Sequence, residues 1–307
     1  MNPALALGTV AAAQGDPFPV LLADEQVRDL SEFAGSVHEL LQRWDELSPR
    51  LRELRAGGSW RPLEGLRVLP PLIPGQILQA GANYRTHVID LAVKHNPDRD
   101  EAAVRAETAE MMDRRVAGGE PYFFIGLTSA VTGPYDDVVL PAYSEKHDWE
   151  LELAAVIGRE AFRVDRADAL SHVAGYTIAN DLTTRDLVFR KDMPEIGSDW
   201  FRAKNAPGFT PLGPWLVPAE FVEEHPRITL RLNGELMQDE STKDMLFDVA
   251  ALVSAASQTT PLRPGDVVLT GSPAGNGLHH GRLLRAGDVM TGSITGLGTQ
   301  TTRCVAP

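Results

Sequence analysis

From Ile77 onward, apolar residues come in short runs punctuated by Gly, Pro, Asn and Asp, a pattern typical of β-strands. The segments with this pattern are ILQAGANY, VVLPAY, WELELAAVIG, VAGYTIAND, RITLRLNGEL, DVVLTGS and DVMTGSITGLG. Helical spacing is predicted for HVIDLAVK, DEAAVRAETAEMMDRRVAGG and TKDMLFDVAALVSAASQT. Strands and helices do not alternate regularly, and neither a GxGxxG nor a Walker-type loop occurs, so a dinucleotide fold is disfavoured.

The first 70 residues have the pattern of a separate small unit. PVLLADEQVRDL predicts short strands, and SVHELLQRWDELSPRLRELRAGG predicts one helix that ends at its Gly-Gly pair. RPLEGLRVLPPLIPG is rich in Pro and Gly and is interpreted as a linker. We therefore predict an α+β, β-rich fold, with a small N-terminal α+β domain at 1–70 and a main domain at 71–307.

Composition narrows the class of protein. The chain has 307 residues, 43% of them hydrophobic and 23% charged, as in ordinary soluble proteins. No run approaches the roughly 18 apolar residues that span a bilayer, and the start has no basic region typical of a secretory signal. The single cysteine, Cys304, excludes an intrachain disulfide, so a cytoplasmic location is expected. A net charge of −13 argues against nucleic acid or an anionic membrane as partner.

The stretch HDWELEL, residues 147–153, has an acid at every second position: Asp148, Glu150 and Glu152. On a strand these acids would share one face, as in a half-exposed strand with charges on its wet side. No Lys or Arg lies between them, however, and neighbouring carboxylates raise each other's pKa unless a cation holds them. A hard divalent ion with oxygen ligands is therefore the second interpretation.

Two further segments offer candidate chemical groups. GYTIAND predicts a strand ending at Asp181, where an acid either joins a site or caps the following turn. In NYRTHVIDLA, His87 and Asp90 are three residues apart and would share a helix face. They are interpreted as a general base with its orienting carboxylate, or as an ordinary exposed pair.

The loops at 204–215 and 270–277 hold more Gly and Pro than a simple hairpin needs, which suits close backbone approach to a ligand or ordinary turns. Lys204 offers the positive charge that an anionic substrate would require. The stretch 95–120 predicts a helix that is acidic at its start, basic at its end and stopped by Gly-Gly. It is interpreted as a lid over a site or as a plain surface helix.

Taken together and in this order, these segments resemble the fumarylacetoacetate hydrolase superfamily. The resemblance covers essentially all of 77–298, and the matching segments are GANYRTHVID, FFIGLTSAVTGP, DWELELAAVIGR, GYTIANDLTTRDL, KNAPGFTPLGPW, LNGELMQDESTKDMLFDVAALVSAAS and LRPGDVVLTGSPAGNG. It implies a mixed β-sandwich roll, usually assembled as a homodimer, with a divalent metal and a small-molecule anionic substrate. The first 70 residues look like the small N-terminal domain that many members carry.

The resemblance also implies roles for individual residues of this chain. The family's metal-binding acids fall on Glu150, Glu152 and Asp181, with Mg²⁺ expected and Ca²⁺ or Mn²⁺ as alternatives, while Asp148 would be structural. The residues implied to be catalytic are His87, Asp90 and Lys204, and those implied to bind substrate are Tyr84, Arg185, Thr270 and Ser272.

Several positions depart from the family pattern. Asp90 stands where many members have Glu, and Ser272 replaces the last Thr of a TGT stretch but keeps a hydroxyl. Gly126 falls on the lysine of a Phe-Leu-Lys-Pro stretch, and Val188 falls on a common Gln. Losing that lysine and that glutamine suggests a substrate larger or less acidic than the small acylpyruvates.

The function implied by the resemblance is metal-dependent hydrolysis of a C–C bond in a 1,3-dicarbonyl acid, in the catabolism of aromatic or sugar-derived compounds. A decarboxylase or isomerase at the same metal site is the alternative, because all three reactions share an enolate. A third interpretation is a metal-binding protein that has lost the catalytic dyad, although Asp90 still carries a carboxylate.

Overall fold

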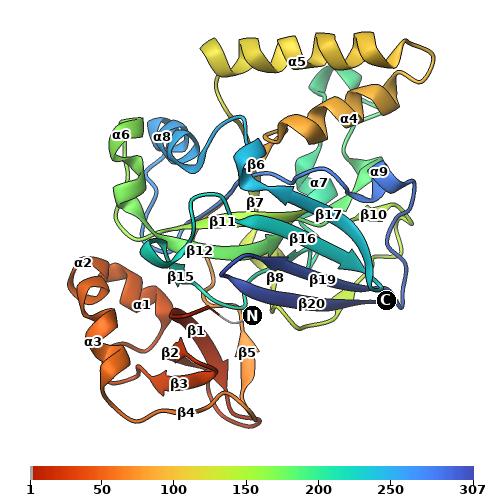
Figure 1. The fold of residues 1–307 in the computed structure, drawn as a ribbon. Helices are drawn as coiled ribbons and strands as arrows, with labels where there is room; N and C mark the ends of the chain where they lie inside the picture. Colours follow the sequence, from red (N-terminus) through yellow and green to blue (C-terminus); the bar gives the residue numbers. More distant parts are fainter. Residues whose placement is uncertain (1–2) are drawn as a thin grey trace.

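The computed structural model describes residues 3–307, and two large β-sheets form the main unit (Figure 1). The six-stranded sheet has the order β15 (Val217–Pro218), β12 (Val173–Asn180), β11 (Leu151–Ile157), β18 (Val267–Leu269), β6 (Ile77–Gly81) and β7 (Tyr122–Gly126). The five-stranded sheet has the order β17 (Glu235–Ser241), β16 (Arg227–Leu232), β19 (Val289–Ile294), β20 (Gly298–Val305) and β9 (Val138–Val139). Two short ladders join β10 (His147–Asp148) to β13 (Thr183–Thr184) and β14 (Thr210–Pro211) to β8 (Val131–Thr132).

The two large sheets pack face to face through alternating apolar side chains. Leu151 and Leu153 of β11 belong to the same buried cluster as Leu230 of β16 and Met290 of β19. Farther along β11 the same face, through Ala155, packs against α8 (Val249–Thr259) and α6 (Arg166–Ala169), whose apolar residues share a second cluster with β12 and β18. The opposite face, through Ala154 and Val156, packs against apolar residues of the N-terminal unit. This arrangement confirms the α+β, β-rich class predicted from the sequence.

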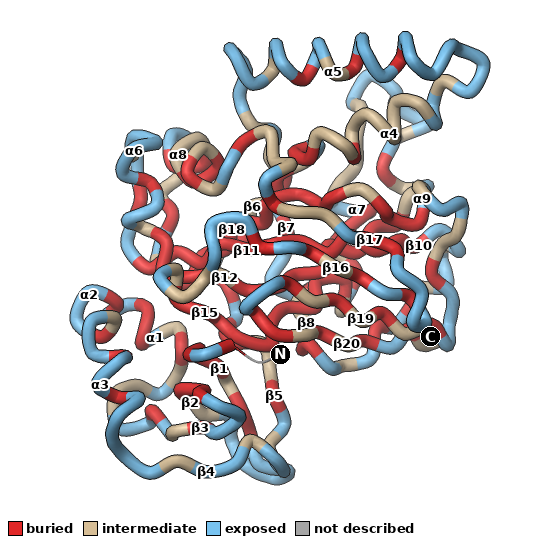
Figure 2. The backbone as a smooth tube through the Cα atoms, in the orientation of Figure 1, coloured by how far each residue is buried: buried red, intermediate tan, exposed pale blue. Residues whose placement is uncertain are grey.

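Two helices project from the body beside the end of β6 (Figure 1): α4 (Arg85–His95) and α5 (Glu101–Gly118). Asp100 caps α5 by accepting a hydrogen bond from the Ala103 amide at 2.8 Å. Figure 2 shows α5 exposed along most of its length, with a short buried row toward α4. The remaining helices of the main unit include α7 (Trp200–Lys204) and α9 (Gly277–His280). Within residues 3–307, no helix is long and apolar enough to cross a bilayer.

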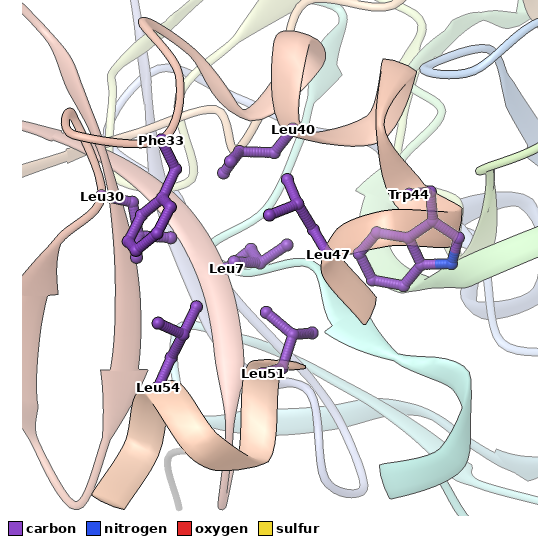
Figure 3. A pocket seen from close by; sticks show the side chains of 8 residues that line it. All are labelled: Leu7, Leu30, Phe33, Leu40, Trp44, Leu47, Leu51 and Leu54. Atoms are coloured by element: carbon purple, nitrogen blue, oxygen red, sulfur yellow. The ribbon is translucent and has the colours of Figure 1, made fainter. Parts of the chain in front are cut away.

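The N-terminal unit is a five-stranded sheet with short helices on one side. Its strands run in the order β4 (Arg61–Pro62), β3 (Gln26–Asp29), β2 (Phe18–Ala23), β1 (Ala6–Ala11) and β5 (Arg67–Leu69), and its helices are α1 (Val37–Gln42), α2 (Trp44–Leu47) and α3 (Leu51–Ala56). Figure 3 shows leucines, Phe33 and Trp44 facing one another between sheet and helices. The space that they enclose is only about 10 Å³. This apolar space is a packed interior rather than a ligand site.

Two expectations for the N-terminal unit were wrong. The predicted single helix is divided, because Arg43 leaves the helical region at φ −114° and Ser48–Arg50, with Pro49 in its first turn, forms a 3₁₀ turn. The predicted linker instead supplies β4 and β5, which pair with β3 and β1. The unit is also tied to the main sheet, since the backbones of Leu7 and Leu216 exchange two hydrogen bonds of 2.8 Å.

The alternating pattern of 147–153 predicts a single strand. In the structure this stretch is instead divided between β10 and β11. The backbone amides at the break bind side chains instead of a neighbouring strand. The Trp149 amide donates to Asp148 Oδ1 at 2.8 Å, and the Glu150 amide donates to Asn180 Oδ1 at 2.9 Å. Because of this break, Asp148 does not lie on the strand face that Glu150 and Glu152 share.

Candidate active site

Three carboxylates meet at one end of the β11–β12 pair, where β11 begins and β12 ends. Antiparallel pairing of these strands places Leu151 opposite Asn180, and the Asp181 amide donates to the Glu150 carbonyl at 2.9 Å. Glu150, Glu152 and Asp181 each offer an oxygen within 4.8 Å of the others, and all three side chains are buried. The sequence prediction of three gathered acids agrees with this arrangement.

Lys204, at the end of α7, points its ammonium group between these acids. Its Nζ donates to Glu150 Oε2 at 2.6 Å, to Asp181 Oδ2 at 2.5 Å and to Thr183 Oγ1 at 2.8 Å. The stacked rings of Phe124 and Trp200 lie 5.2 and 5.7 Å from Nζ, so aromatic faces cover the cation. Lys204 is only 2% exposed, so its charge acts on the carboxylates with little screening by water.

Arg185 and Asp148 form the next layer of charge. The Arg185 guanidinium donates through Nε to Asp148 Oδ2 and through Nη2 to Glu150 Oε1, both at 2.7 Å. Asp148 Oδ1 also accepts from the Gly277 amide at 2.5 Å, so this carboxylate holds the start of α9. Asp148 is therefore placed to orient Arg185 and the 276–280 turn, as the structural role expected for it requires.

The electrostatics of the three acids differ. Burial opposes ionisation of Glu150, but the charges of Arg185 and Lys204 outweigh it and hold its pKa well below the usual range. Burial together with the Asp181 charge raises the pKa of Glu152 well above its ordinary value. Burial also raises the pKa of Asp181 to about 6, despite the opposing effect of Lys204. The two basic groups therefore satisfy Glu150 and leave Glu152 and Asp181 short of positive charge.

This shortage fits a divalent cation. Among residues 3–307, the bases that pair with Asp148, Glu150, Glu152 and Asp181 are Lys204 and Arg185, so the fully ionised cluster has two negative charges in excess. Carboxylate oxygens are the ligands that Mg²⁺, Ca²⁺ and Mn²⁺ prefer. Glu150, Glu152 and Asp181 are the residues that could hold such an ion, and its charge would balance the cluster.

His87 lies in the first turn of α4 and is buried. Burial lowers its pKa to about 4, and Glu150 exerts the strongest opposing charge on it. The ring is thus neutral near pH 7 and can accept a proton. The Asp90 carboxylate, however, binds Arg105 Nη1 of α5 at 3.0 Å and lies 3.7 Å from His279 Nδ1. The His87–Asp90 dyad expected from the sequence stays a prediction.

Of the four residues expected to bind substrate, three have polar groups that are hydrogen-bonded within the protein. Tyr84 is fully buried, and its hydroxyl has no hydrogen-bond partner among residues 3–307. Thr270 donates to the Leu153 carbonyl at 3.0 Å, and Ser272 accepts from Gln238 at 2.9 Å. Arg185 is held by the two acids described above. Substrate contacts by these residues stay predictions.

Sequence reasoning missed three polar residues that support the acids. Gln79 Nε2 donates to Asp181 Oδ1 at 2.5 Å, Thr183 Oγ1 donates to Glu150 Oε2 at 3.2 Å, and Asn180 fixes the Glu150 backbone. The signal for Gln79 was present as one amide inside the apolar run ILQAG, since a polar side chain in a buried strand needs a partner. The partner itself is 102 residues away in sequence and could not be predicted.

The paired sheets and the buried carboxylate cluster define a β-rich fold with a site of the kind found in metal-dependent enzymes. The family model for the fumarylacetoacetate (FAA) hydrolase C-terminal domain matches residues 76–305. The chain therefore belongs to the fumarylacetoacetate hydrolase family, whose members are enzymes, as the resemblance predicted.

Relatives in this family have different activities. The chain is 40% identical over 183 residues to the human mitochondrial oxaloacetate tautomerase FAHD2B, covering 58% of this chain but only 57% of that protein. It is 37% identical over 233 residues to 2,4-didehydro-3-deoxy-L-rhamnonate hydrolase from a Sphingomonas strain, covering 74% and 72% of the two chains. A solved fumarylacetoacetate hydrolase from Exiguobacterium antarcticum is 28% identical, with a TM-score of 0.79 over 99% of this chain and 100% of that chain.

Proposed function

We propose that this protein is a metal-dependent hydrolase that cleaves a C–C bond in a 1,3-dicarbonyl acid. The observation that carries the proposal is the buried triad of Glu150, Glu152 and Asp181, short of positive charge and beside a neutral His87. The similarity to a hydrolase of a sugar-derived acid supports the substrate class. Mg²⁺ stays the predicted ion, with Ca²⁺ and Mn²⁺ as alternatives, and a cytoplasmic location stays a prediction.

In the proposed reaction, a divalent ion held by the triad supplies charge neutralisation and Lewis-acid polarisation of a carbonyl. An imidazole nitrogen of His87 takes a proton from water, and the hydroxide adds to the distal carbonyl carbon. The C–C bond then breaks, its electron pair leaves with the neighbouring carbon as an enolate, and a proton returned from His87 completes the ketone product. Lys204 supplies positive charge for the developing oxyanion.

A tautomerase, isomerase or decarboxylase is the second candidate. It is favoured by the 40% identity to an oxaloacetate tautomerase over the segment that the two chains share. Such reactions need the same cation site but no attacking water. Tautomerisation and isomerisation also need a proton acceptor, whereas decarboxylation needs a proton donor for the enolate that it leaves. Product analysis therefore separates the two candidates.

The first experiment incubates the protein with acylpyruvates, larger 2,4-diketo acids and oxaloacetate, with Mg²⁺, Mn²⁺ or EDTA. Hydrolysis is expected to release pyruvate or another 2-keto acid together with the matching acid, and EDTA is expected to stop it. Exchange of the keto and enol forms without bond cleavage, or release of CO₂ alone, would replace the hydrolase proposal with the second candidate.

The role of His87 can be tested separately from metal binding. His87→Ala is expected to lower kcat by about 10²–10⁴-fold, the usual contribution of a general base, while metal affinity stays that of the parent. The matched control is His95→Ala, because His95 is an exposed residue on the same helix. Turnover by His87→Ala at the parent rate would contradict the proposed proton transfer.

The helical segment at 95–120 is proposed to act as a lid. Arg105 of α5 holds the Asp90 carboxylate at 3.0 Å, and Lys94 Nζ of α4 donates to the Leu278 carbonyl of α9 at 2.9 Å. Movement of α5 that separates Arg105 from Asp90 would leave this carboxylate free to orient His87. The lid would in this way couple access to the site with completion of the dyad.

An exposed apolar surface at the free edge of the six-stranded sheet supports the homodimer expected from the resemblance. Ile125 of β7, Phe189, Ile196 and Phe201 are each between 66% and 69% exposed. We call these four residues the edge patch. Three basic and three acidic residues lie along 190–202, so this segment has no net charge, whereas the whole chain has a net charge of −13. A second copy could therefore approach here without net repulsion, with acids of one subunit facing bases of the other.

Self-association through the edge patch predicts a specific loss of dimer. Phe201→Glu is expected to convert the dimer to a monomer, because it would place a charge in an apolar interface. Leu170→Glu, which alters another exposed apolar side chain beside α6, is the matched control and should stay dimeric. Light scattering after size exclusion measures the mass. A dimeric Phe201→Glu, or a monomeric parent, would contradict the proposed interface.

A further inference from the structure

Gln79 is a buried polar residue inside an otherwise apolar strand. It lies in β6, is 1% exposed, and points to the same side as Ile77, while Leu78 and Ala80 pack against the opposite cluster. Burying an amide costs free energy unless its polar atoms are hydrogen-bonded. A glutamine at this position therefore calls for a contact that an apolar residue could not make.

That contact is with the candidate metal site. Gln79 Nε2 donates to Asp181 Oδ1 at 2.5 Å, while Lys204 donates to Oδ2 of the same carboxylate at 2.5 Å. Gln79 comes from β6 and Lys204 from α7, and each donates to a different oxygen of Asp181. They therefore fix the plane of the carboxylate, and each hydrogen bond is strengthened by the carboxylate charge.

Space for the Gln79 amide depends on a glycine in the neighbouring strand. Gly126 of β7 lies opposite Ile77, and a Cβ added to it would lie 2.8 Å from Gln79 Oε1 and 3.1 Å from Gln79 Cδ. Gly126 does not have a positive φ, so the backbone conformation does not require glycine. The requirement is steric: a side chain at 126 would force the Gln79 amide out of its present position.

We infer that Gln79 is a positioning residue for the metal ligand Asp181, and that it occupies the place of the side chain missing at Gly126. Gln79, in the space left by Gly126, supplies a neutral donor to Asp181, whereas a second cationic donor would neutralise the carboxylate. Asp181 stays oriented, and the cluster keeps the negative charge that a divalent cation needs. This inference rests on the proposed metal site.

Isothermal titration with Mn²⁺ tests the inference on the full chain. Gln79→Met keeps the side-chain length but removes the donor, and it is expected to weaken Mn²⁺ binding by about 10–100-fold, as is usual when a residue that orients a metal ligand is lost. Leu78→Met changes the neighbouring residue on the opposite face and should bind Mn²⁺ like the parent. Thermal unfolding in EDTA checks that each variant is folded.

A double-mutant cycle then tests the link to Gly126. Gly126→Ala is expected to weaken Mn²⁺ binding by a similar factor in the parent, because the new methyl displaces the amide. In a Gln79→Ala background the same change should have no further effect. Parent-like affinity of Gln79→Met, or an equal effect of Gly126→Ala in both backgrounds, would overturn the inference and leave the proposed function standing. A parent that binds no divalent ion would overturn both.

Discussion

Lys204→Met is expected to lower the free energy of unfolding of the metal-free protein by about 3–5 kcal/mol, the usual cost of leaving a buried charge without its partner. Methionine matches the lysine stem in length, so packing against Phe124 and Trp200 is kept. What disappears is the ammonium group that donates to Glu150 at 2.6 Å and to Asp181 at 2.5 Å. Arg185 still neutralises Glu150, but Asp181 keeps only the neutral donor Gln79.

Urea unfolding in EDTA measures this change as a shift of the midpoint. Lys191→Met, which removes an exposed lysine, is the control and should unfold like the parent. Saturating Mn²⁺ or Mg²⁺ is expected to recover part of the loss, because the ion replaces the missing positive charge and binds only the folded state. Unfolding of Lys204→Met at the parent midpoint in EDTA would mean that the lysine does not compensate the acids.

The sequence allowed the main strands and the long helices to be predicted, because each depends on local patterns, whereas the set of three acids was predicted only through the family resemblance. Alternation and turn residues mark β12, β16 and β19, and helical spacing marks α4, α5 and α8. The break at residues 149–150 was not predictable, since it depends on Asn180 accepting from the Glu150 amide. The strands β4 and β5 were mistaken for a linker because their pairing with β3 and β1 is a long-range contact.

The dyad illustrates the same limit at the site. Spacing correctly predicted that His87 and Asp90 lie on one helix, but the partner of Asp90 in this structure is Arg105, from a different helix. A sequence pattern states which groups can meet, whereas competing ion pairs decide which groups do meet. Lys204 and Arg185 pair with Glu150 and its neighbouring acids. Within the described part of the chain, the Glu152 carboxylate accepts a hydrogen bond from the Gly271 amide alone, at 2.8 Å.

Glu152→Gln is therefore expected to have opposite effects on stability and on metal binding. Burial and the Asp181 charge raise the pKa of Glu152 well above its ordinary value, so the folded parent holds a proton there that the unfolded chain has released. The folded state binds more protons between the two pKa values, and the stability of the metal-free parent falls as pH rises through that window. Glutamine carries no proton to lose and avoids this penalty.

In EDTA, Glu152→Gln should accordingly be more stable than the parent at about pH 8, with the difference shrinking toward about pH 4, the ordinary range of a glutamate. With Mn²⁺ the parent should be more stable than the variant, because the variant lacks one metal ligand. Loss of a residue that only orients a ligand weakens metal binding by up to about 100-fold, and loss of the ligand itself should weaken it by more. Glu145→Gln, at an exposed acid, is the control. Urea midpoints across pH, with and without Mn²⁺, measure both effects. A variant less stable than the parent in EDTA at pH 8 would show that Glu152 carries its charge there without cost, and the case for a cation deficit at this site would fail with it.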